Sequence, residues 1–398
     1  MFHDFDTLKI IERENPLFDE ERSKYKNSIS KEVEKASFMI IGGGGSIGRS
    51  VVKELVQLKA KKIHVVDINE NNLAELVREI RSSNVNFGGE LKTYVLDVGS
   101  TEFHHFFMNQ SPYDFVLNLS ALKHVRSEKD PYTLMRMIRV NILNVELLME
   151  LLLQKGIRRF FSVSTDKAVK PASLMGASKR VMELLLISKK DDLHVSSARF
   201  VNVAFSEGSL LWSFLKRIEK NQPISVPRKI KRYFITLEES AFLCIFTTLF
   251  ANSGEIFTMK LEKLKPVTLV DIAVNLLSHY GFEPFFTEDE REAKFRLSEL
   301  VKAKMWPVYL SPPDTTGEKE IEELYSATEK IDSKRFENLI VVLPEDTQAY
   351  TKSSQIIEGL KRLLENKNWS RDDIKNLFQL HLPEFNHIDT GKYLDDRM

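Results

Sequence analysis

A glycine-rich turn is the feature that most constrains how this chain of 398 residues can fold. Glycines at 42, 45 and 48 follow an apolar segment, 38–41, and precede a segment with helical spacing of apolar residues. The first glycine permits a tight turn, the second lets the backbone approach a pyrophosphate, and the third allows the helix to pack closely on the strand. The helix N-terminus would then face the phosphates with free N–H groups. We therefore predict a dinucleotide site at Gly42, Gly45, Ser46, Ile47 and Gly48.

An acidic residue, Asp67, ends the second predicted strand. A carboxylate at this place accepts hydrogen bonds from the adenosine ribose hydroxyls and repels a 2′-phosphate, so NAD is expected and NADP is less favoured. Asp97 and Val98, which end the third strand, are predicted to contact the adenine. The end of the fourth strand is expected on the nicotinamide side of the cofactor, with contacts from Asn118, Ser120, Ala121 and Lys123.

The alternation of strands and helices defines the fold class. Apolar β-branched strands alternate with helical segments up to about residue 203, which predicts an α/β fold with a doubly wound parallel sheet of Rossmann type. Beyond about residue 205, prolines break the pattern into shorter pieces, typical of a smaller lobe. We expect a helical N-terminal extension (1–35), an NAD-binding domain (36–204), a substrate-binding lobe from which some segments return to the first domain (205–368), and a helical C-terminal tail (369–398).

The charge balance and the hydropathy of the chain exclude several classes of partner. Lys and Arg number 57, as do Asp and Glu, so no global basic field indicates nucleic acid or an anionic membrane. No segment approaches the roughly 18 apolar residues of a membrane span, and the charged N-terminus has no signal-peptide core. A cytoplasmic protein is expected. The single cysteine, Cys244, is compatible with a reducing compartment, and the histidines lack metal-ligand spacing.

A polar segment, Ser164-Thr165-Asp166-Lys167, closes the fifth predicted strand, and Met175 and Lys179 lie four residues apart on the helix that follows. Residues four apart share a helix face. Here the chain resembles the extended short-chain dehydrogenases, in which Tyr-x-x-x-Lys carries the redox step and the Lys binds the nicotinamide ribose. Lys179 matches that Lys, and Met175 occupies the place of the Tyr.

The wider pattern resembles the UDP-N-acetylglucosamine 4,6-dehydratases of surface-glycan synthesis, some of which also carry Met at this place. The resemblance runs from about residue 37 to 260 and reappears at Gly317-Glu318-Lys319. It rests on Ser164 to Pro171 with Met175 to Lys179, on Asn118 to Val125, on Asn141, on Ala198 to Val203, and on Arg232 to Thr236. The chain departs from the family at Thr315-Thr316, where Arg-Pro is usual, and in residues 282–312, which look like an insertion.

The resemblance implies a reaction in which NAD takes a hydride from sugar C4, a base removes the C5 proton, an acid protonates the departing C6 hydroxyl, and the hydride returns to C6. Related enzymes use an Asp-Glu pair for the two proton transfers. Our hypothesis makes Lys167 the base and Asp166 the acid, which requires Lys167 to be partly neutral. Without the Tyr, the C4 hydroxyl proton must leave through Asp166, Thr165 or a water.

The expected partner is a UDP-sugar. Guanidinium forks suit phosphate oxygens, although structural salt bridges are an alternative for the arginines. The predicted substrate-binding residues are Lys123, Asn141, Arg199, Asn202, Ser209, Arg232 and Glu318. A homo-oligomer, dimer or higher, is also expected, since such folds commonly pair through two long helices, and the apolar face of residues 135–153 could serve.

Two other functions remain open. One is a nucleotide-sugar 4-epimerase or reductase on the same scaffold, which has no use for a C5 base and C6 acid and normally needs the Tyr. The other is a catalytically silent NAD-binding scaffold. The missing Tyr and Arg favour the scaffold, whereas Asp166, Lys167 and Lys179 oppose it.

Overall fold

A nine-stranded sheet forms the centre of the molecule in the computed structural model, which describes residues 5–312, 322–344 and 347–391. Its order is β15-β16-β11-β6-β5-β4-β1-β2-β3, and every neighbouring pair from β3 to β11 is parallel. The bounds are β1 Ser37–Ile41, β2 Lys62–Asp67, β3 Glu90–Val95, β4 Phe115–Asn118, β5 Arg159–Thr165, β6 Val195–Phe200, β11 Ile256–Met259, β15 Ile331–Asp332 and β16 Leu339–Val342. This arrangement confirms the predicted doubly wound sheet.

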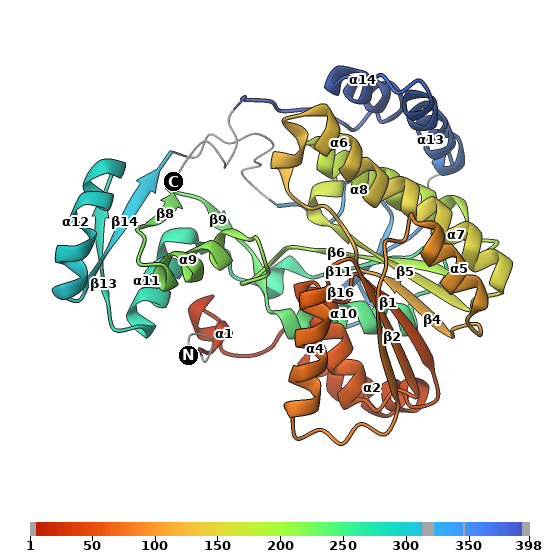
Figure 1. Ribbon diagram of the computed structural model, residues 1–398, viewed down its shortest axis with the longest axis horizontal. Helices are drawn as coiled ribbons and strands as arrows, with labels where there is room; N and C mark the ends of the chain where they lie inside the picture. The colour runs from red at the N-terminus through yellow and green to blue at the C-terminus, as the bar shows by residue number, and fades with distance from the viewer. Residues whose placement is uncertain (1–4, 313–321, 345–346, 392–398) are drawn as a thin grey trace.

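Helices cover both faces of this sheet and enclose a separate apolar core on each (Figure 1). The central strands are buried on both faces, as their near-continuous apolar sequences require. One face carries α2 Asp19–Val33, α3 Ser46–Gln57, α4 Glu70–Ser82 and α10 Leu237–Phe250. The other face carries α5 Thr101–Asn109, α6 Pro131–Ile138, α7 Asn144–Lys155, α8 Leu174–Ser188, α13 Ala349–Glu365 and α14 Arg371–His381.

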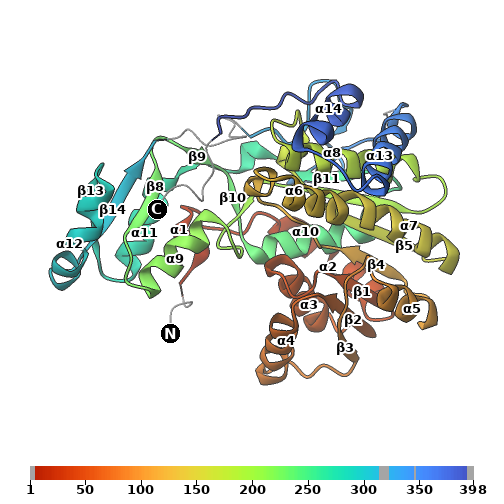
Figure 2. The same cartoon turned by 45° about the horizontal axis from the view of Figure 1, so that its top comes forward.

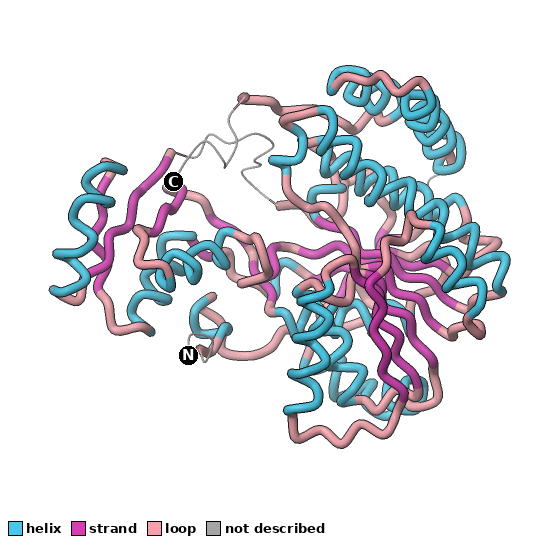
Figure 3. The backbone as a smooth tube through the Cα atoms, in the orientation of Figure 1, coloured by secondary structure: helices cyan, strands magenta, loops and turns pink. Residues whose placement is uncertain are grey.

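A second lobe has its own three-stranded parallel sheet, of order β13-β14-β8 (Figure 3). Segment 282–312 supplies two of the three strands and one helix of this lobe. The elements are β8 Ile224–Pro227, β13 Glu283–Thr287, β14 Met305–Ser311, α1 Thr7–Ile10, α9 Leu210–Glu219, α11 Leu269–His279 and α12 Glu290–Lys302. Two further two-stranded sheets are separate from these: β7 Asn202–Val203 pairs with β10 Phe234–Ile235, and β9 Lys231–Arg232 pairs with β12 Val267–Thr268.

The terminal segments pack on the folded lobes. Ile10 and Ile11 are buried in the second lobe, whereas α2 packs under the large sheet. The tail lies over α8 in Figure 2, where α14 follows α13. It is tied down by Trp369 Nε1, which donates to the carbonyl of Pro131 over 3.0 Å, and by the amide of Ile388, which donates to the carbonyl of Ala172 over 2.9 Å.

The helical segment that precedes Gly156 is interrupted by a π turn, η2 Arg139–Leu143, between α6 and α7. The segment ends with Gly156 in the left-handed conformation at φ 65°, which is a common way to close a helix. In the segment proposed for subunit pairing, Leu148 and Leu152 are buried in the core that also holds residues of α8 and α13, whereas Leu153 is 38% exposed. Lys361 of α13 pairs with Glu146 of α7 at 2.8 Å.

Within the described residues, no helix combines the length and the apolar character that crossing a bilayer requires.

Candidate active site

The glycine turn joins β1 to α3, and Gly45 stands at the N-cap of the helix. Gly42 has φ 75°, and a Cβ built there would lie 2.5 Å from the amide nitrogen of Ser120. At Gly48 a Cβ would lie 2.2 Å from the carbonyl oxygen of Gly42, whereas at Gly45 the same oxygen is 3.5 Å away, an ordinary contact. Packing thus requires the first and third glycines. The bare backbone at Gly45, beside the helix N-terminus, fits the close approach of a pyrophosphate.

Asp67 is held beside this turn by two backbone groups. Its Oδ2 accepts from the amide of Gly44 and its Oδ1 from the amide of Asn69, both over 2.9 Å. Each carboxylate oxygen keeps a lone pair for a ribose hydroxyl. The position of Asp67 therefore fits the adenosine side of a dinucleotide.

The residues that follow β3 and those at the end of β4 differ in how far they are open to a ligand. Asp97 accepts from Arg136 over 2.8 Å and from the amide of Gly99 over 3.0 Å, and Val98 is buried. Asn118 is buried too and joins the ends of β4 and β5, since it donates to Ser162 Oγ over 3.1 Å and accepts from Ser120 Oγ over 2.7 Å. Beyond them, Ser120 and Ala121 are half-buried, and the ammonium of Lys123 donates to Ser206 Oγ over 3.2 Å.

At the end of β5, Thr165, Asp166 and Lys167 form one hydrogen-bonded set. Thr165 Oγ1 donates to Asp166 Oδ1 over 2.7 Å, and Lys167 Nζ lies 3.0 and 3.2 Å from the two carboxylate oxygens. Asp166 is buried, while 37% of the Lys167 side chain is exposed. Burial by itself lowers the pKa of Lys167, but the carboxylates of Asp166 and Glu322 outweigh it and raise that pKa above its usual value. The partly neutral Lys167 that our hypothesis requires is therefore not the state found in this arrangement.

Lys179 and Met175 lie on α8, the helix that comes after β5 in the chain. The buried ammonium of Lys179 donates to the carbonyl of Val163 over 2.9 Å, and burial lowers the pKa of Lys179 to about 8, against the opposing charge of Glu183. Met175 is 2% exposed and belongs to the apolar core. No proton-transfer group stands at the position of the absent Tyr.

Glu322 is a member of this site that sequence reasoning missed. Its carboxylate is buried and accepts from the amide of Tyr233 over 2.9 Å and from the side-chain amide of Asn202. Burial and the charge of Asp166 raise the pKa of Glu322 to about 7, although Lys167 and Arg232 oppose the shift. Its only signal in the sequence is an acidic run after Gly317, a pattern more typical of a solvated segment.

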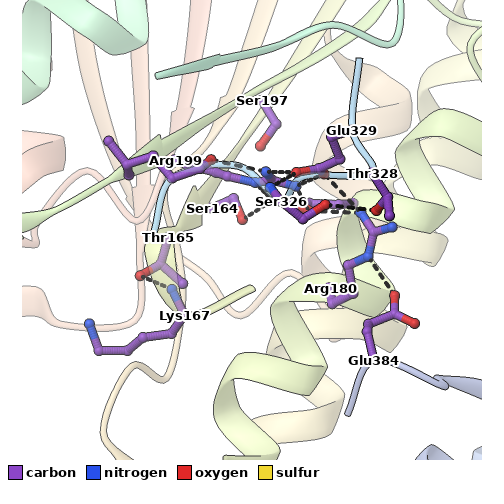
Figure 4. Close-up of polar contacts among 12 residues, drawn as sticks. Ser164, Thr165, Lys167, Arg180, Ser197, Arg199, Ser326, Thr328, Glu329 and Glu384 are labelled. Carbon is purple, nitrogen blue, oxygen red and sulfur yellow. Dashed lines mark hydrogen bonds and ion pairs between the residues drawn. The ribbon is translucent and has the colours of Figure 1, made fainter. Parts of the chain in front are cut away.

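The prediction that Arg199 binds the substrate is wrong. Arg199 is fully buried, and its five N–H donors reach the carboxylates of Glu183 and Glu329 and the carbonyl of Leu324, at 2.7–3.1 Å (Figure 4). Figure 4 shows the side chain of Lys167 extending away from this network. Because no donor of Arg199 remains, it cannot hold a diphosphate.

Asn141 likewise has an internal position rather than a ligand-facing one. It lies in the π turn, is 1% exposed, and exchanges two hydrogen bonds of 3.0 Å with the backbone of Leu122. Its amide also donates to Ser178 Oγ over 3.0 Å. The predicted contact of Asn141 with the substrate is therefore replaced by a positioning role, since it ties the loop after β4 to α8.

The remaining predicted substrate residues have different surroundings. Asn202 holds Glu322, and the Nε atom of Arg232 lies 3.8 Å from the same carboxylate, so both surround one anionic position. Ser209 caps α9 by accepting from the amide of Trp212 over 3.1 Å and is half-buried. Glu318 lies outside the described residues.

Comparison with known proteins agrees with this geometry. The family model described as "Polysaccharide biosynthesis protein" matches residues 38–344. An uncharacterized membrane protein of Methanocaldococcus jannaschii is 28% identical over 88% of this chain and 97% of its own length. The capsular polysaccharide biosynthesis protein CapD of Staphylococcus aureus is 31% identical over 64% of this chain, but the match spans only 42% of CapD.

An inverting UDP-N-acetylglucosamine 4,6-dehydratase of Campylobacter jejuni is 27% identical over 61% of this chain and 72% of that protein. Among solved structures, Pen from Bacillus thuringiensis has a TM-score of 0.65 at 23% identity, covering 79% of this chain and 89% of Pen. The resemblance inferred from the sequence motifs is thereby confirmed at the level of the family.

Proposed function

Because this chain belongs to the polysaccharide biosynthesis protein family, we propose that it is an NAD-dependent nucleotide-sugar 4,6-dehydratase, a lyase. Its substrate is a UDP-N-acetylglucosamine-like sugar, and its product is the 4-keto-6-deoxy sugar. The observation that carries the proposal is the Thr165–Asp166–Lys167 set at the end of β5, near Lys179, with Met175 at the place of the redox Tyr.

The residues of the turn and Asp67 would hold NAD, which supplies an acceptor for the C4 hydride and returns that hydride within the same cycle. The amides at the start of α3 would face its pyrophosphate, and Asp67 would accept from its adenosine ribose. Lys179 would donate to the nicotinamide ribose. Its pKa of about 8 leaves most molecules protonated at neutral pH, as that role requires.

The elimination of water needs one acid and one base side by side, and Asp166 with Lys167 supplies both. As the pair stands, Lys167 is an ammonium and Asp166 its acceptor at 3.0 Å. Transfer of one proton along this contact turns Lys167 into a base and Asp166 into an acid, the state that our hypothesis needs. A sugar that covered the exposed part of Lys167 would favour this neutral pair, since desolvation penalises charged groups.

Asn202, Arg232, Ser209 and Lys123 are the described side chains that we propose for the sugar and the diphosphate. Asn202 and Arg232 already surround one carboxylate, that of Glu322. Donors of this kind also suit phosphate oxygens. The proposed substrate is thus an anionic nucleotide sugar.

The test is incubation of the purified protein with UDP-N-acetylglucosamine and mass spectrometry of the products. Loss of one water is expected from the wild type, and it should be lost or strongly reduced in Lys167→Ala and Asp166→Asn. Lys170→Ala, an exposed neighbour paired with Glu323, is the matched control and should behave as the wild type. A 4-epimerase would give a product of unchanged mass, and a silent scaffold would give none. Undiminished turnover in either of the first two variants would remove that residue from its role.

A further inference from the structure

The proposed reaction moves protons at C4, C5 and C6, and the two residues assigned so far account only for those at C5 and C6. Asp166 and Lys167 serve C5 and C6, while the C4 hydroxyl must lose its proton as its hydride leaves. Met175 cannot accept that proton, because it is a buried thioether in the apolar core. The inference that follows therefore rests on the proposed function and concerns the proton of the C4 hydroxyl.

The other charged groups near β5 are already committed. Lys179 is a donor directed at the carbonyl of Val163. Glu183 is fully buried, and its two carboxylate oxygens accept from Arg199 and from Ser164 Oγ. Neither can serve as a proton acceptor for a sugar hydroxyl.

Glu322 differs from these groups in its surroundings. Its neutral hydrogen-bond donors are the Tyr233 amide and the Asn202 side chain, and the Nε atom of Arg232 stands farther away at 3.8 Å. The charged groups that act on it are Asp166 and Lys167 from the end of β5 and Arg232 from β9. Glu322 thus contacts the proposed substrate residues Asn202 and Arg232 and interacts electrostatically with the proposed elimination pair.

The loop that carries Glu322 is anchored to the rigid core. The carbonyl of Leu324 accepts from Arg199 over 3.1 Å, and Glu329 binds the same guanidinium over 2.7 Å. These contacts fix the residues that follow Glu322 in the chain. The position of Glu322 relative to Asp166 is therefore set by the fold.

We propose that Glu322 is the proton acceptor for the C4 hydroxyl, in the role that Met175 leaves unfilled. In this step the C4 O–H bond breaks and its proton forms an O–H bond with the Glu322 carboxylate. The C4 hydrogen leaves as hydride to the oxidised nicotinamide cofactor, and a C4 ketone forms. The proton then passes to the Asp166–Lys167 pair, where it replaces the one that departs with the C6 hydroxyl as water. Lys167 returns its proton to C5 as the hydride returns to C6, so the cycle neither consumes nor releases a proton.

The ionisation of Glu322 suits this task. Burial and the negative charge of Asp166 bring its pKa to about 7, and an acceptor is most effective when its pKa is near the working pH. Glu322 must be ionised to accept a proton. The kcat of the wild type should therefore rise with pH through about 7.

The decisive experiment compares Glu322→Gln with Glu323→Gln on UDP-N-acetylglucosamine. The first substitution keeps the size of the side chain but removes its ability to take a proton, whereas Glu323 is the adjacent, partly exposed carboxylate and serves as the matched control. We expect kcat to fall about 100-fold or more in Glu322→Gln, with the rise of kcat near pH 7 abolished and KM little changed. A substrate deuterated at C4 should show a larger isotope effect on kcat in this variant. Glu323→Gln should match the wild type.

The other outcomes separate the two proposals. If the wild type forms the dehydrated product and Glu322→Gln keeps its kcat, Glu322 is not the acceptor, but the dehydratase proposal stands. Unchanged kcat with a lower KM would mean that Glu322 only occupies the hydrogen-bond donors of the protein that bind the anionic substrate. Loss of the C4 step in Thr165→Val, with Glu322→Gln unaffected, would assign the proton to Thr165 instead. If the wild type yields no dehydrated product, both proposals fall.

Discussion

The carboxylate of Glu183 and the guanidinium of Arg199 meet at 2.7 Å with both side chains fully buried. Glu183 also accepts from Ser164 Oγ over 2.6 Å, and Arg199 binds Glu329. Four separate parts of the chain, β5, α8, β6 and the loop before β15, are thus joined through one buried network beside the proposed active site.

Removal of the charge of Arg199 should destabilise the protein severely. Arg199→Met would leave Glu183 and Glu329 buried without their partner, and we expect the free energy of unfolding to fall by about 3–5 kcal/mol. Urea unfolding followed by circular dichroism measures this. The control is Arg362→Met, at a helix pair that is 74% and 64% exposed, where the change should stay within about 0.5 kcal/mol. Similar small losses in both variants would contradict the structural role of Arg199.

Alanine at two glycines of the turn should have different effects. Gly48→Ala would place its Cβ against the carbonyl of Gly42, and we expect a loss of about 1–3 kcal/mol of stability or more. Gly45→Ala meets only an ordinary contact, so it should fold as the wild type yet bind NAD more weakly, because its methyl group would lie where the pyrophosphate approaches. Thermal unfolding and calorimetric titration with NAD separate the two effects. Equal stability of both variants would refute the packing argument.

The choice between NAD and NADP should depend on Asp67. Asp67→Asn removes the charge that would repel a 2′-phosphate, while retaining an acceptor for one of the two neighbouring amides. We expect NAD binding about 10-fold weaker, equivalent to about 1.4 kcal/mol, and NADP binding stronger than in the wild type. Asp97→Asn, at the end of the next strand, should leave the ratio of the two affinities unchanged. An unaltered ratio in Asp67→Asn would assign the discrimination elsewhere.

Stability should vary with pH through Lys179. Burial lowers the pKa of Lys179 from 10.5 in the unfolded chain to about 8 in the folded one. Between these values the unfolded state binds more protons, so stability rises with pH from about 8 to 10.5 and is lowest below about 8. Lys179→Met lacks this dependence, so the unfolding free energy of the wild type should rise relative to that of the variant by up to about 3 kcal/mol across the window.

Lys170→Met, at an exposed lysine, should follow the wild type through the same pH range. Parallel curves for the wild type and Lys179→Met would mean that Lys179 is not buried in its charged form.

Local features of the sequence were sufficient for the parallel sheet and for the glycine turn. The turn at Gly42 to Gly48 and the acid at Asp67 depend on residues that are neighbours in the chain or on the ends of adjacent strands, so spacing and residue type are enough to interpret them. The same holds for Asp166 and Lys167, which are consecutive. Their mutual charge state, by contrast, depends in part on Glu322, more than 150 positions later.

Side-chain roles that arise from long-range packing could not be predicted from the sequence. An arginine that suits a phosphate and an arginine that is paired in the core have the same residue type, and only the approach of Glu183 and Glu329 shows that Arg199 is the second kind. In the same way, only the structure shows that α13 packs on α8 and that its Lys361 pairs with Glu146 of α7.

The sequence by itself determined a dinucleotide-binding α/β fold and the Asp166–Lys167 pair, because these follow from periodicity, turn chemistry and adjacency along the chain. Only the tertiary structure decided that Glu322 joins that pair and that Arg199 and Asn141 do not face a ligand. Burial, and with it the cost of a charge and the pKa of an acid, is a property of segments brought together from distant parts of the chain.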